Sequence, residues 1–338
     1  MTTIRDVATR AGVSTATVSR ALSGRGYVGA ATRDQVERAA AELNYIPNAL
    51  ARGLKTRRSG LIGLVIPEIA DPFFSELAQW VEQAASERGF QVLLGASLGD
   101  REREATYLNL MVAHEVDGAI VCPAREAQAT WEVVQRHGIP TVFVDDYPRG
   151  VPVDAVLSDN AGGMALLTRR MLMLGHRRIG LVGGQRSSVP GRQREEGYVS
   201  ALVEAGIEVD PALMTGGDWT VAEGERRAGA MLDLPDRATA LLAGSAPLAA
   251  GMMRAIRARG LRAPDDVSVG TFDDPLLASD MDPFMTCVQQ PIDRICSTAA
   301  RVLLARMDGL EIGAPMVHVL PVELTVRRSC GAALAAVR

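Results

Sequence analysis

Three residues near the N-terminus have side chains suited to reading the edges of DNA base pairs. Thr15 and Ala16 are small, and Arg20 follows one helical turn after Ala16. A helix over these positions would place all three on one face, where a major groove could receive them. An arginine there can donate two hydrogen bonds to a guanine, which is worth about 1–3 kcal/mol of discrimination. Double-stranded DNA is therefore the first candidate partner.

The neighbouring residues predict a helix-turn-helix followed by a third helix. Thr3 can cap the first helix, Gly12 permits a tight turn, and Ser14 can cap the second helix, Thr15–Leu22. An ordinary helical hairpin would show similar spacing. The third amphipathic helix, at about Ala30–Leu43, favours a free-standing unit because it supplies the apolar side that a small three-helix core needs.

The net charge of −4 is distributed unevenly along the chain. Residues 1–59 hold ten basic and four acidic side chains, a net charge of +6, so the remainder carries −10. A basic segment suits DNA because contacts with phosphates supply most of the non-specific affinity. The charge pattern and the helix pattern thus indicate the same partner.

From residue 60 onward, two series of short apolar strands alternate with amphipathic helices, which is typical of parallel sheets covered on both faces. The fold class that we expect is a small all-α helix-turn-helix DNA-binding domain plus an α/β core of two doubly wound parallel-sheet subdomains. The expected strands are 61–66, 92–96, 119–122, 141–145, 179–184, 240–245 and 267–272. The expected helices include 73–88, 248–259 and 291–307. We expect a crossover at 287–291 and a final strand at about 317–324 in the second subdomain.

Composition and the N-terminal sequence predict a cytoplasmic, nucleoid-associated protein. The segment MTTIRDVATR has charges where a signal peptide needs an apolar run, and no stretch approaches the roughly 18 apolar residues of a transmembrane helix. The four cysteines lack close spacing, which favours buried thiols over a metal site or a disulfide. We expect neither a metal nor a cofactor.

The chain resembles the lactose/galactose-repressor family of bacterial transcription regulators over essentially its whole length. Three segments carry the resemblance most specifically: TIRDVATRAGVSTATVSRALSG, V-x-x-x-T-R-x-x-V from Val28 to Val36, and LNYIPNALARGLKTRRSGLIGLVIP. The resemblance implies a core of the periplasmic-binding-protein-like type. Two departures, Ser23 for the usual Asn and Gly29 for a Ser cap, leave the fold intact because glycine is a tolerable cap.

The resemblance assigns base reading to the second helix. It implies that Thr15 and Ala16 discriminate base pairs and that Thr17 and Arg20 add base or phosphate contacts. The DNA-binding residues proposed for the first helices are Thr3, Ser14, Thr15, Ala16, Thr17 and Arg20.

Residues 48–54 match the hinge helix of this family. Seven residues containing Gly53 fall below the roughly 12–15 that an isolated helix needs in water, so we expect this segment to order only with DNA and a partner's hinge. Leu54 matches the apolar wedge that kinks the duplex between base steps. The DNA-binding residues proposed here are Asn48, Ala51, Leu54 and Lys55.

Polar and aromatic residues at strand ends of the core are candidates for a small-molecule site, because such folds bind ligands at the carboxyl ends of their strands. The resemblance implies carboxylates and an arginine for hydroxyls or charges, and aromatic rings for stacking. The candidates are Phe73, Asp145, Arg194, Trp219, Ser245 and Asp273. Asp145 and Asp273 could alternatively cap the following helices. The clearest departure is Ser245-Ala246, where the family typically has Asn-Asp.

These features divide the chain into four parts. A helix-turn-helix domain is expected at 1–47, with its motif at about 4–23, and a hinge and linker at 48–59. Two effector-binding subdomains are expected at 60–157 plus 289–316 and at 158–288 plus 317–330.

The expected function is a transcription regulator, in the first instance a repressor. It would bind a palindromic operator as a homodimer under control of a small-molecule effector, a carbohydrate or a derivative. The C-terminus is too short for the leucine heptads of the family's tetramers. The alternative is a cytoplasmic small-molecule-binding protein of the same core fold without operator control. A sugar-processing enzyme is a third class, but the sequence has no nucleophile elbow, phosphate loop or metal-ligand spacing.

Overall fold

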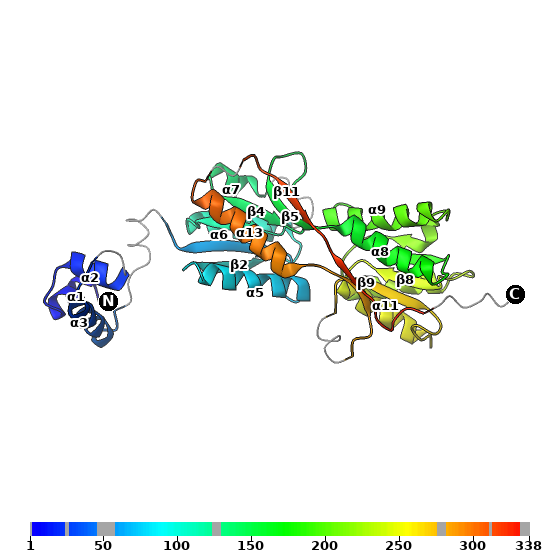
Figure 1. Ribbon diagram of the computed structural model, residues 1–338, viewed down its shortest axis with the longest axis horizontal. Helices are drawn as coiled ribbons and strands as arrows, with labels where there is room; N and C mark the ends of the chain where they lie inside the picture. Colours follow the sequence, from blue (N-terminus) through cyan, green and yellow to red (C-terminus); the bar gives the residue numbers. More distant parts are fainter. Residues whose placement is uncertain are drawn as a thin grey trace. The chain divides into compact units, whose positions relative to one another are not determined.

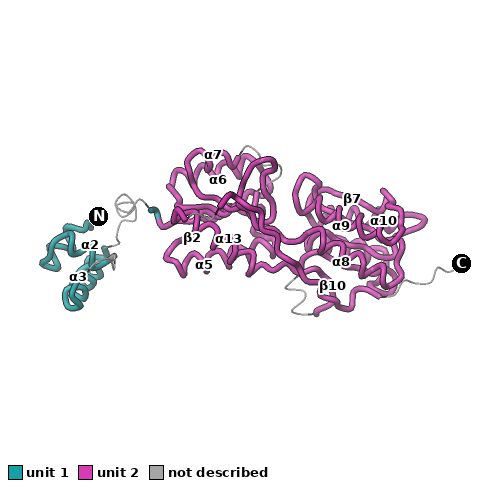
Figure 2. The backbone as a smooth tube through the Cα atoms, turned by 45° about the horizontal axis from the view of Figure 1, so that its top comes forward, with its two compact units in different colours: residues 1–59 teal, residues 60–338 magenta. Residues whose placement is uncertain are grey.

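The computed structural model describes residues 2–23, 27–45, 58–123, 130–275, 282–310 and 313–331. The chain divides into two compact units, residues 1–59 and residues 60–338 (Figure 2). Each unit buries its own hydrophobic side chains. Among the described residues, no helix has the length and apolarity needed to cross a membrane.

The described part of the first unit contains three helices, α1 (Ile4–Arg10), α2 (Thr15–Ser23) and α3 (Ala30–Glu42). The backbone N–H and the hydroxyl of Thr3 donate to the Asp6 carboxylate at 2.7 and 2.8 Å, which fixes the start of α1. The core between the helices consists of small aliphatic side chains, Val7, Ala8, Ala11, Val18, Ala21, Val36, Ala39 and Ala40.

The second unit contains two sheets, each with six described strands and with helices on both faces (Figure 1). The first sheet is parallel throughout, in the order β11-β5-β4-β3-β1-β2. Its strands are β1 (Leu61–Ile66), β2 (Gln91–Ala96), β3 (Gly118–Val121), β4 (Thr141–Val144), β5 (Asp154–Ser158) and β11 (Val317–Leu320). Its helices are α5 (Pro72–Ser86), α6 (Arg101–Ala113), α7 (Glu132–Arg136) and α13 (Ile292–Met307).

The second sheet has the equivalent order β12-β10-β9-β8-β6-β7, and only its edge strand β12 runs antiparallel to its neighbour in the described ladders. Its strands are β6 (Ile179–Val182), β7 (Met214–Thr215), β8 (Ala240–Ala243), β9 (Ser268–Phe272), β10 (Thr286–Gln289) and β12 (Glu323–Thr325). Its helices are α8 (Asn160–Met173), α9 (Val189–Glu204), the 3-10 turn η1 (Pro211–Leu213), α10 (Val221–Leu232) and α11 (Ala246–Ala258).

Apolar side chains on both faces of each sheet determine which helices cover it. In the first sheet, α5 and α13 pack on one face and α6 and α7 on the other. In the second sheet, α10 and α11 cover one face and α8 and α9 the other. Strands buried on both faces are continuous apolar runs, as in the segment LIGLVI of β1. The structure thus confirms the fold class expected from the sequence.

The chain crosses between the two sheets at three places: between β5 and α8, between β10 and α13, and between β11 and β12. The predicted final strand at 317–324 in the second subdomain is wrong for its first half, because β11 pairs with β5 in the first sheet. Pro321 has no N–H to give to a ladder, so the strand ends there and the chain moves to the second sheet. The predicted crossover at 287–291 also begins as a strand, β10.

Candidate functional site

Helix α2 presents a face of small polar groups and one arginine. Thr15, Ala16 and Arg20 are exposed, whereas Val18 and Ala21 are buried in the three-helix core. The predicted reading residues therefore share the outer face of this helix. Such a face can enter a major groove without steric hindrance from large side chains.

The two predicted cap residues and Thr17 have structural partners of their own. The Ser14 hydroxyl accepts the backbone N–H of Thr17 at 3.1 Å and lies 2.9 Å from the Thr17 hydroxyl. Hydrogen bonds from the backbone and hydroxyl of Thr3 lower the pKa of Asp6. Thr3, Ser14 and Thr17 thus fix the starts of the helices, and any DNA contact would be made alongside that role.

Tyr27, which is not among the predicted site residues, lies shortly before α3 and is 94% exposed. A largely exposed aromatic ring on a basic unit is a further candidate for DNA contact, and its position after a Gly-rich stretch of sequence was the only signal of exposure. The hinge candidates Asn48, Ala51, Leu54 and Lys55 lie outside the residues that the structure describes.

Two aspartates occupy equivalent positions in the two sheets. Asp145 follows β4 and Asp273 follows β9, and both have a positive φ, 69° and 68°. Their backbone N–H groups donate to equivalent neighbours, Val156 on β5 at 3.2 Å and Val288 on β10 at 2.9 Å. A non-glycine residue with this backbone conformation is uncommon and marks functional positions more often than others. The predicted alternative role as helix caps does not fit these two residues, because no described helix starts immediately after either.

Arg194 on α9 is the central cation of the core and is only 4% exposed. Its Nε donates to Asn160 Oδ1 at 2.8 Å, and one terminal nitrogen donates to the Gly244 carbonyl at 2.6 Å. The same nitrogen lies 3.8 Å from Asp273 Oδ2. The guanidinium also stacks 3.7 Å from the centre of the Phe272 ring. These contacts hold a buried charge in one orientation.

Three aspartates, Asp71, Asp145 and Asp273, surround this arginine, so the acidic groups outnumber the basic group around it. Burial raises the pKa of Asp145 to about 7, against the opposing charge of Arg194. Burial, together with the charge of Asp273, raises the pKa of Asp71 to about 6. Burial also raises the pKa of Asp273, against Arg194 and the hydrogen bond from Gln290. Clustered groups with shifted pKa values are typical of ligand sites.

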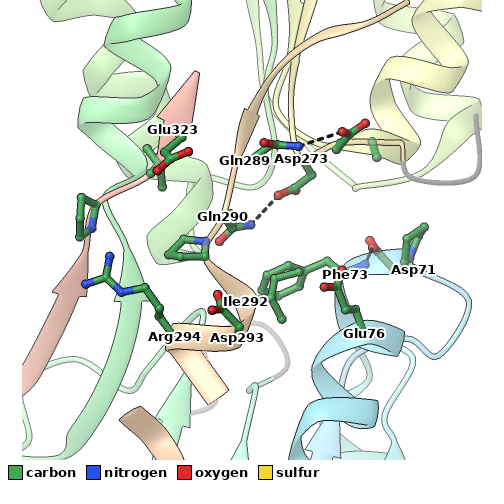
Figure 3. Close-up of a pocket in the computed structure, with 16 residues that line it drawn as sticks. Asp71, Phe73, Glu76, Asp273, Gln289, Gln290, Ile292, Asp293, Arg294 and Glu323 are labelled. Atoms are coloured by element: carbon green, nitrogen blue, oxygen red, sulfur yellow. Dashed lines mark hydrogen bonds between the residues drawn. The ribbon is translucent and has the colours of Figure 1, made fainter. Parts of the chain in front are cut away.

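A cavity of about 640 Å³ opens beside this cluster. Figure 3 shows its walls, with Asp71, Phe73 and Glu76 from one subdomain and Asp273, Gln289 and Gln290 from the other. Its charged lining consists of six acidic residues and one arginine: Asp71, Glu76, Asp273, Asp274, Asp293, Glu323 and Arg294. Of the six predicted effector residues, Phe73 and Asp273 line this cavity directly.

Of the other predicted residues, Asp145 and Trp219 lie close to the buried Arg194. Asp145 interacts electrostatically with Arg194, and the Trp219 ring lies with its centre 5.7 Å from the guanidinium. The Trp219 ring packs against Gly184 so closely that a Cβ there would lie 1.9 Å from it. Ser245 precedes α11, whose first residue, Ala246, lines the cavity. The Ser245 hydroxyl is buried and has no hydrogen-bond partner among the described residues.

Three polar residues of this region were not predicted as site residues. Asp71 reads in sequence as the cap of α5, and it does accept the Phe73 N–H at 3.0 Å. Asn160 and Gln290 lie at crossovers, and although a crossover was predicted at 287–291, no local pattern indicates the partners of either side chain. Within the described parts of the chain, no group of acidic, histidine or cysteine side chains could hold a metal ion.

Comparisons with known proteins match both units. Residues 3–48 match the model of bacterial regulatory proteins of the lacI family, and residues 168–330 match the periplasmic-binding-protein-like domain. The repressor CytR of Escherichia coli (strain K12) is 34% identical over 327 residues, which cover 97% of this chain and 96% of CytR. The chain is a member of the lacI family.

Other lacI-family proteins agree in length and in fold. The regulator CelR of Thermobifida fusca is 37% identical over 337 residues, covering 97% of this chain and 98% of CelR. A CelR–cellobiose complex superposes with a TM-score of 0.74 at 35% identity, over 97% of this chain and 100% of that one. The lac repressor dimer bound to operator and the anti-inducer ONPF superposes with a TM-score of 0.86 at 31% identity, over 98% of this chain and 99% of that one. This lacI-family chain is therefore a DNA-binding transcription regulator.

Proposed function

We propose that the chain represses transcription by binding a near-palindromic operator as a homodimer, through Thr15, Ala16, Thr17 and Arg20 of each copy. The proposal places the protein in the cytoplasm, at the nucleoid. The observation that carries it is the outer face of α2, which exposes small groups and an arginine on a unit of net charge +6. Thr3, Ser14 and Tyr27 would add contacts beside this face, and the segment with Asn48, Ala51, Leu54 and Lys55 would contact the minor groove.

A homodimer is proposed because one helix-turn-helix reads only half of a palindromic site. An apolar surface at the β2 edge supports it, since four large side chains there are 38–58% exposed: Trp80, Leu94, Leu98 and Leu110. Helices α5 and α6, which carry Trp80 and Leu110, both pack against β2. A second copy covering this edge would bury these side chains.

The effector proposed for the cleft is an uncharged carbohydrate or derivative. Carboxylates of Asp71, Asp145 and Asp273 can accept hydrogen bonds from hydroxyls, and Phe73 and Trp219 can contact the apolar face of a sugar ring. A phosphorylated sugar fits poorly, because the acidic residues outnumber the basic ones in the cavity wall. The cellobiose complex of the relative CelR is consistent with this class.

Selection of DNA from a random duplex pool by the purified chain tests the proposal. We expect an inverted repeat that is bound with a strong salt dependence and is preferred over a scrambled duplex. Binding of all duplexes alike would contradict it. The alternative, a small-molecule-binding protein of the same core fold without operator control, is disfavoured by the match of residues 3–48 to the lacI-family model. It predicts ligand binding with no selected DNA sequence.

A further inference from the structure

The buried arginine and the crossovers belong to one closed ring of polar contacts. The Ser158 hydroxyl donates to Gln290 Oε1 at 2.6 Å, and Gln290 Nε2 donates to Asp273 Oδ1 at 2.6 Å (Figure 3 shows the second bond). Asp273 faces Arg194 at 3.8 Å. Arg194 donates to Asn160, whose Nδ2 donates back to the Ser158 carbonyl at 3.2 Å. We call these five residues the crossover ring.

The crossover ring connects both subdomains at the places where the chain passes between them. Ser158 ends β5 in the first sheet and Asn160 begins α8 on the second, so this pair spans one crossover. Gln290 lies in another crossover, between β10 and α13. Asp273 and Arg194 belong to the second subdomain, and Asp273 lines the effector cleft. A change at the cleft therefore reaches two crossovers through direct hydrogen bonds.

We propose that Gln290 and Ser158 are positioning residues, which couple occupancy of the cleft to the two crossovers through the contacts of the crossover ring. This inference rests on the proposed function. One oxygen of Asp273 accepts from Gln290, and the other lies 3.8 Å from Arg194. Because Asp273 lines the cavity, a ligand hydroxyl that donates to it competes with these two contacts of the ring. Without a ligand, the intact ring holds the crossovers in one arrangement.

Three side chains of the ring are removed from solvent, and their further side-chain hydrogen bonds are Asn160 to Gln193 at 3.4 Å and Arg194 to the Gly244 carbonyl at 2.6 Å. Ser158 and Asn160 are almost completely buried, as is Arg194. The Ser158 bond fixes the orientation of the Gln290 amide, because the oxygen that accepts from Ser158 leaves the nitrogen to donate to Asp273. Since buried polar groups rarely remain unpaired, breaking one bond should rearrange its neighbours.

The test measures operator binding by the full chain without any small molecule, using a duplex that the wild type has selected from a random pool. Ser158→Ala removes the bond between the first sheet and Gln290. Thr325→Val is the matched control, because it removes a similar hydroxyl-to-glutamine bond, Thr325 to Gln289 at 2.8 Å, whose partners both lie in the second sheet. We expect Ser158→Ala to change the operator dissociation constant by about fivefold or more, and Thr325→Val to leave it unchanged.

A second variant separates positioning from simple loss of stability. Gln290→Glu keeps the acceptor for Ser158, but the introduced carboxyl group cannot donate to Asp273 while it is ionised. Once protonated it can donate, and the neighbouring carboxylate of Asp273 favours its protonation. We therefore expect the operator affinity of Gln290→Glu to differ from the wild type at about pH 8 and to approach it at about pH 6.

Two results would overturn the proposal. One is equal operator affinity for the wild type and Ser158→Ala, or equal changes in Ser158→Ala and Thr325→Val. The other is a Gln290→Glu affinity whose ratio to the wild type stays constant with pH. A wild type that selects no DNA sequence would instead refute the proposed function, so the two failures are distinguishable.

Discussion

The outer face of α2 and the effector cleft bind their partners with opposite kinds of surface. On α2, Thr15, Ala16 and Arg20 are exposed, Arg20 follows one helical turn after Ala16, and the Ser14 cap fixes the start of the helix. In the cleft, a nearly buried arginine is shared by three carboxylates from three separate loops. The first surface can lose a side chain with little effect on folding. The second combines binding with stability, because its charges are removed from water.

The largest effect is expected for Arg194→Met, which leaves Asp71, Asp145 and Asp273 without their shared cation. We expect a loss of about 3–5 kcal/mol in the free energy of unfolding at neutral pH, together with loss of effector binding. Denaturant unfolding measures the loss. Arg169→Met is the control: it removes an exposed ion pair with Glu204, at 2.7 Å, and should leave the free energy of unfolding nearly unchanged. Equal stabilities of the two variants would contradict the contrast between the surfaces.

On the exposed surface, Arg20→Ala should affect DNA and leave folding alone. We expect operator binding to weaken by about 1–3 kcal/mol and the preference at one base position to relax. The free energy of unfolding should change by no more than about 0.5 kcal/mol. Fluorescence anisotropy with operator variants measures the first effect. Arg38→Ala on α3 is the control, and a matching loss of base preference in that variant would refute the role of Arg20.

The raised pKa of Asp145 gives the cleft a dependence on pH. Its pKa in the folded chain, about 7, exceeds the ordinary 3.8, so the folded state binds the proton more tightly. Proton binding by Asp145 therefore stabilises the folded state at low pH, and this stabilisation is lost as the pH rises from about 4 to about 7. Asp145→Asn removes this loss, so it should gain about 3 kcal/mol relative to the wild type between pH 5 and pH 8. Parallel stability curves for the two proteins would exclude this role for Asp145.

A smaller effect separates base reading from dimer formation. Leu94→Glu at the edge of the first sheet should weaken self-association by about 1–2 kcal/mol, because it places a charge in the proposed interface. Operator affinity should fall at low protein concentration, while the preferred base sequence stays unchanged. Sedimentation velocity and DNA selection measure the two effects. Unchanged association would assign the dimer interface to another surface.

The two surfaces also differ in how far the sequence predicts them. The α2 face follows from local rules, since helical spacing and caps determine which residues point outward. In the cleft, the positions of Asp145 and Asp273 at strand ends predicted them as site residues, and the family resemblance predicted an arginine, Arg194, beside them. Asp71 was not predicted as a site residue, because its local role as the cap of α5 hides the position that places it near Asp273.

Pairing between distant segments accounts for the remaining errors. Nothing in the sequence around 317–324 distinguishes the edge of one sheet from that of the other, and the structure uses both. Gln290 was likewise expected in a plain crossover segment. Its contacts with Ser158 and Asp273 depend on chain segments 132 and 17 residues away.

Measuring operator affinity with and without a bound sugar tests whether occupancy of the cleft controls DNA binding. Thermal-shift screening of sugars, sugar phosphates, polyols and nucleobases identifies a compound that raises the melting temperature. Anisotropy then gives the dissociation constant of the selected operator at zero and saturating compound. We predict a change of about 5- to 150-fold, with uncharged sugars as the active class. A compound that binds in the cleft and stabilises the protein, but leaves the operator dissociation constant unchanged, would show that occupancy of the cleft does not control DNA binding.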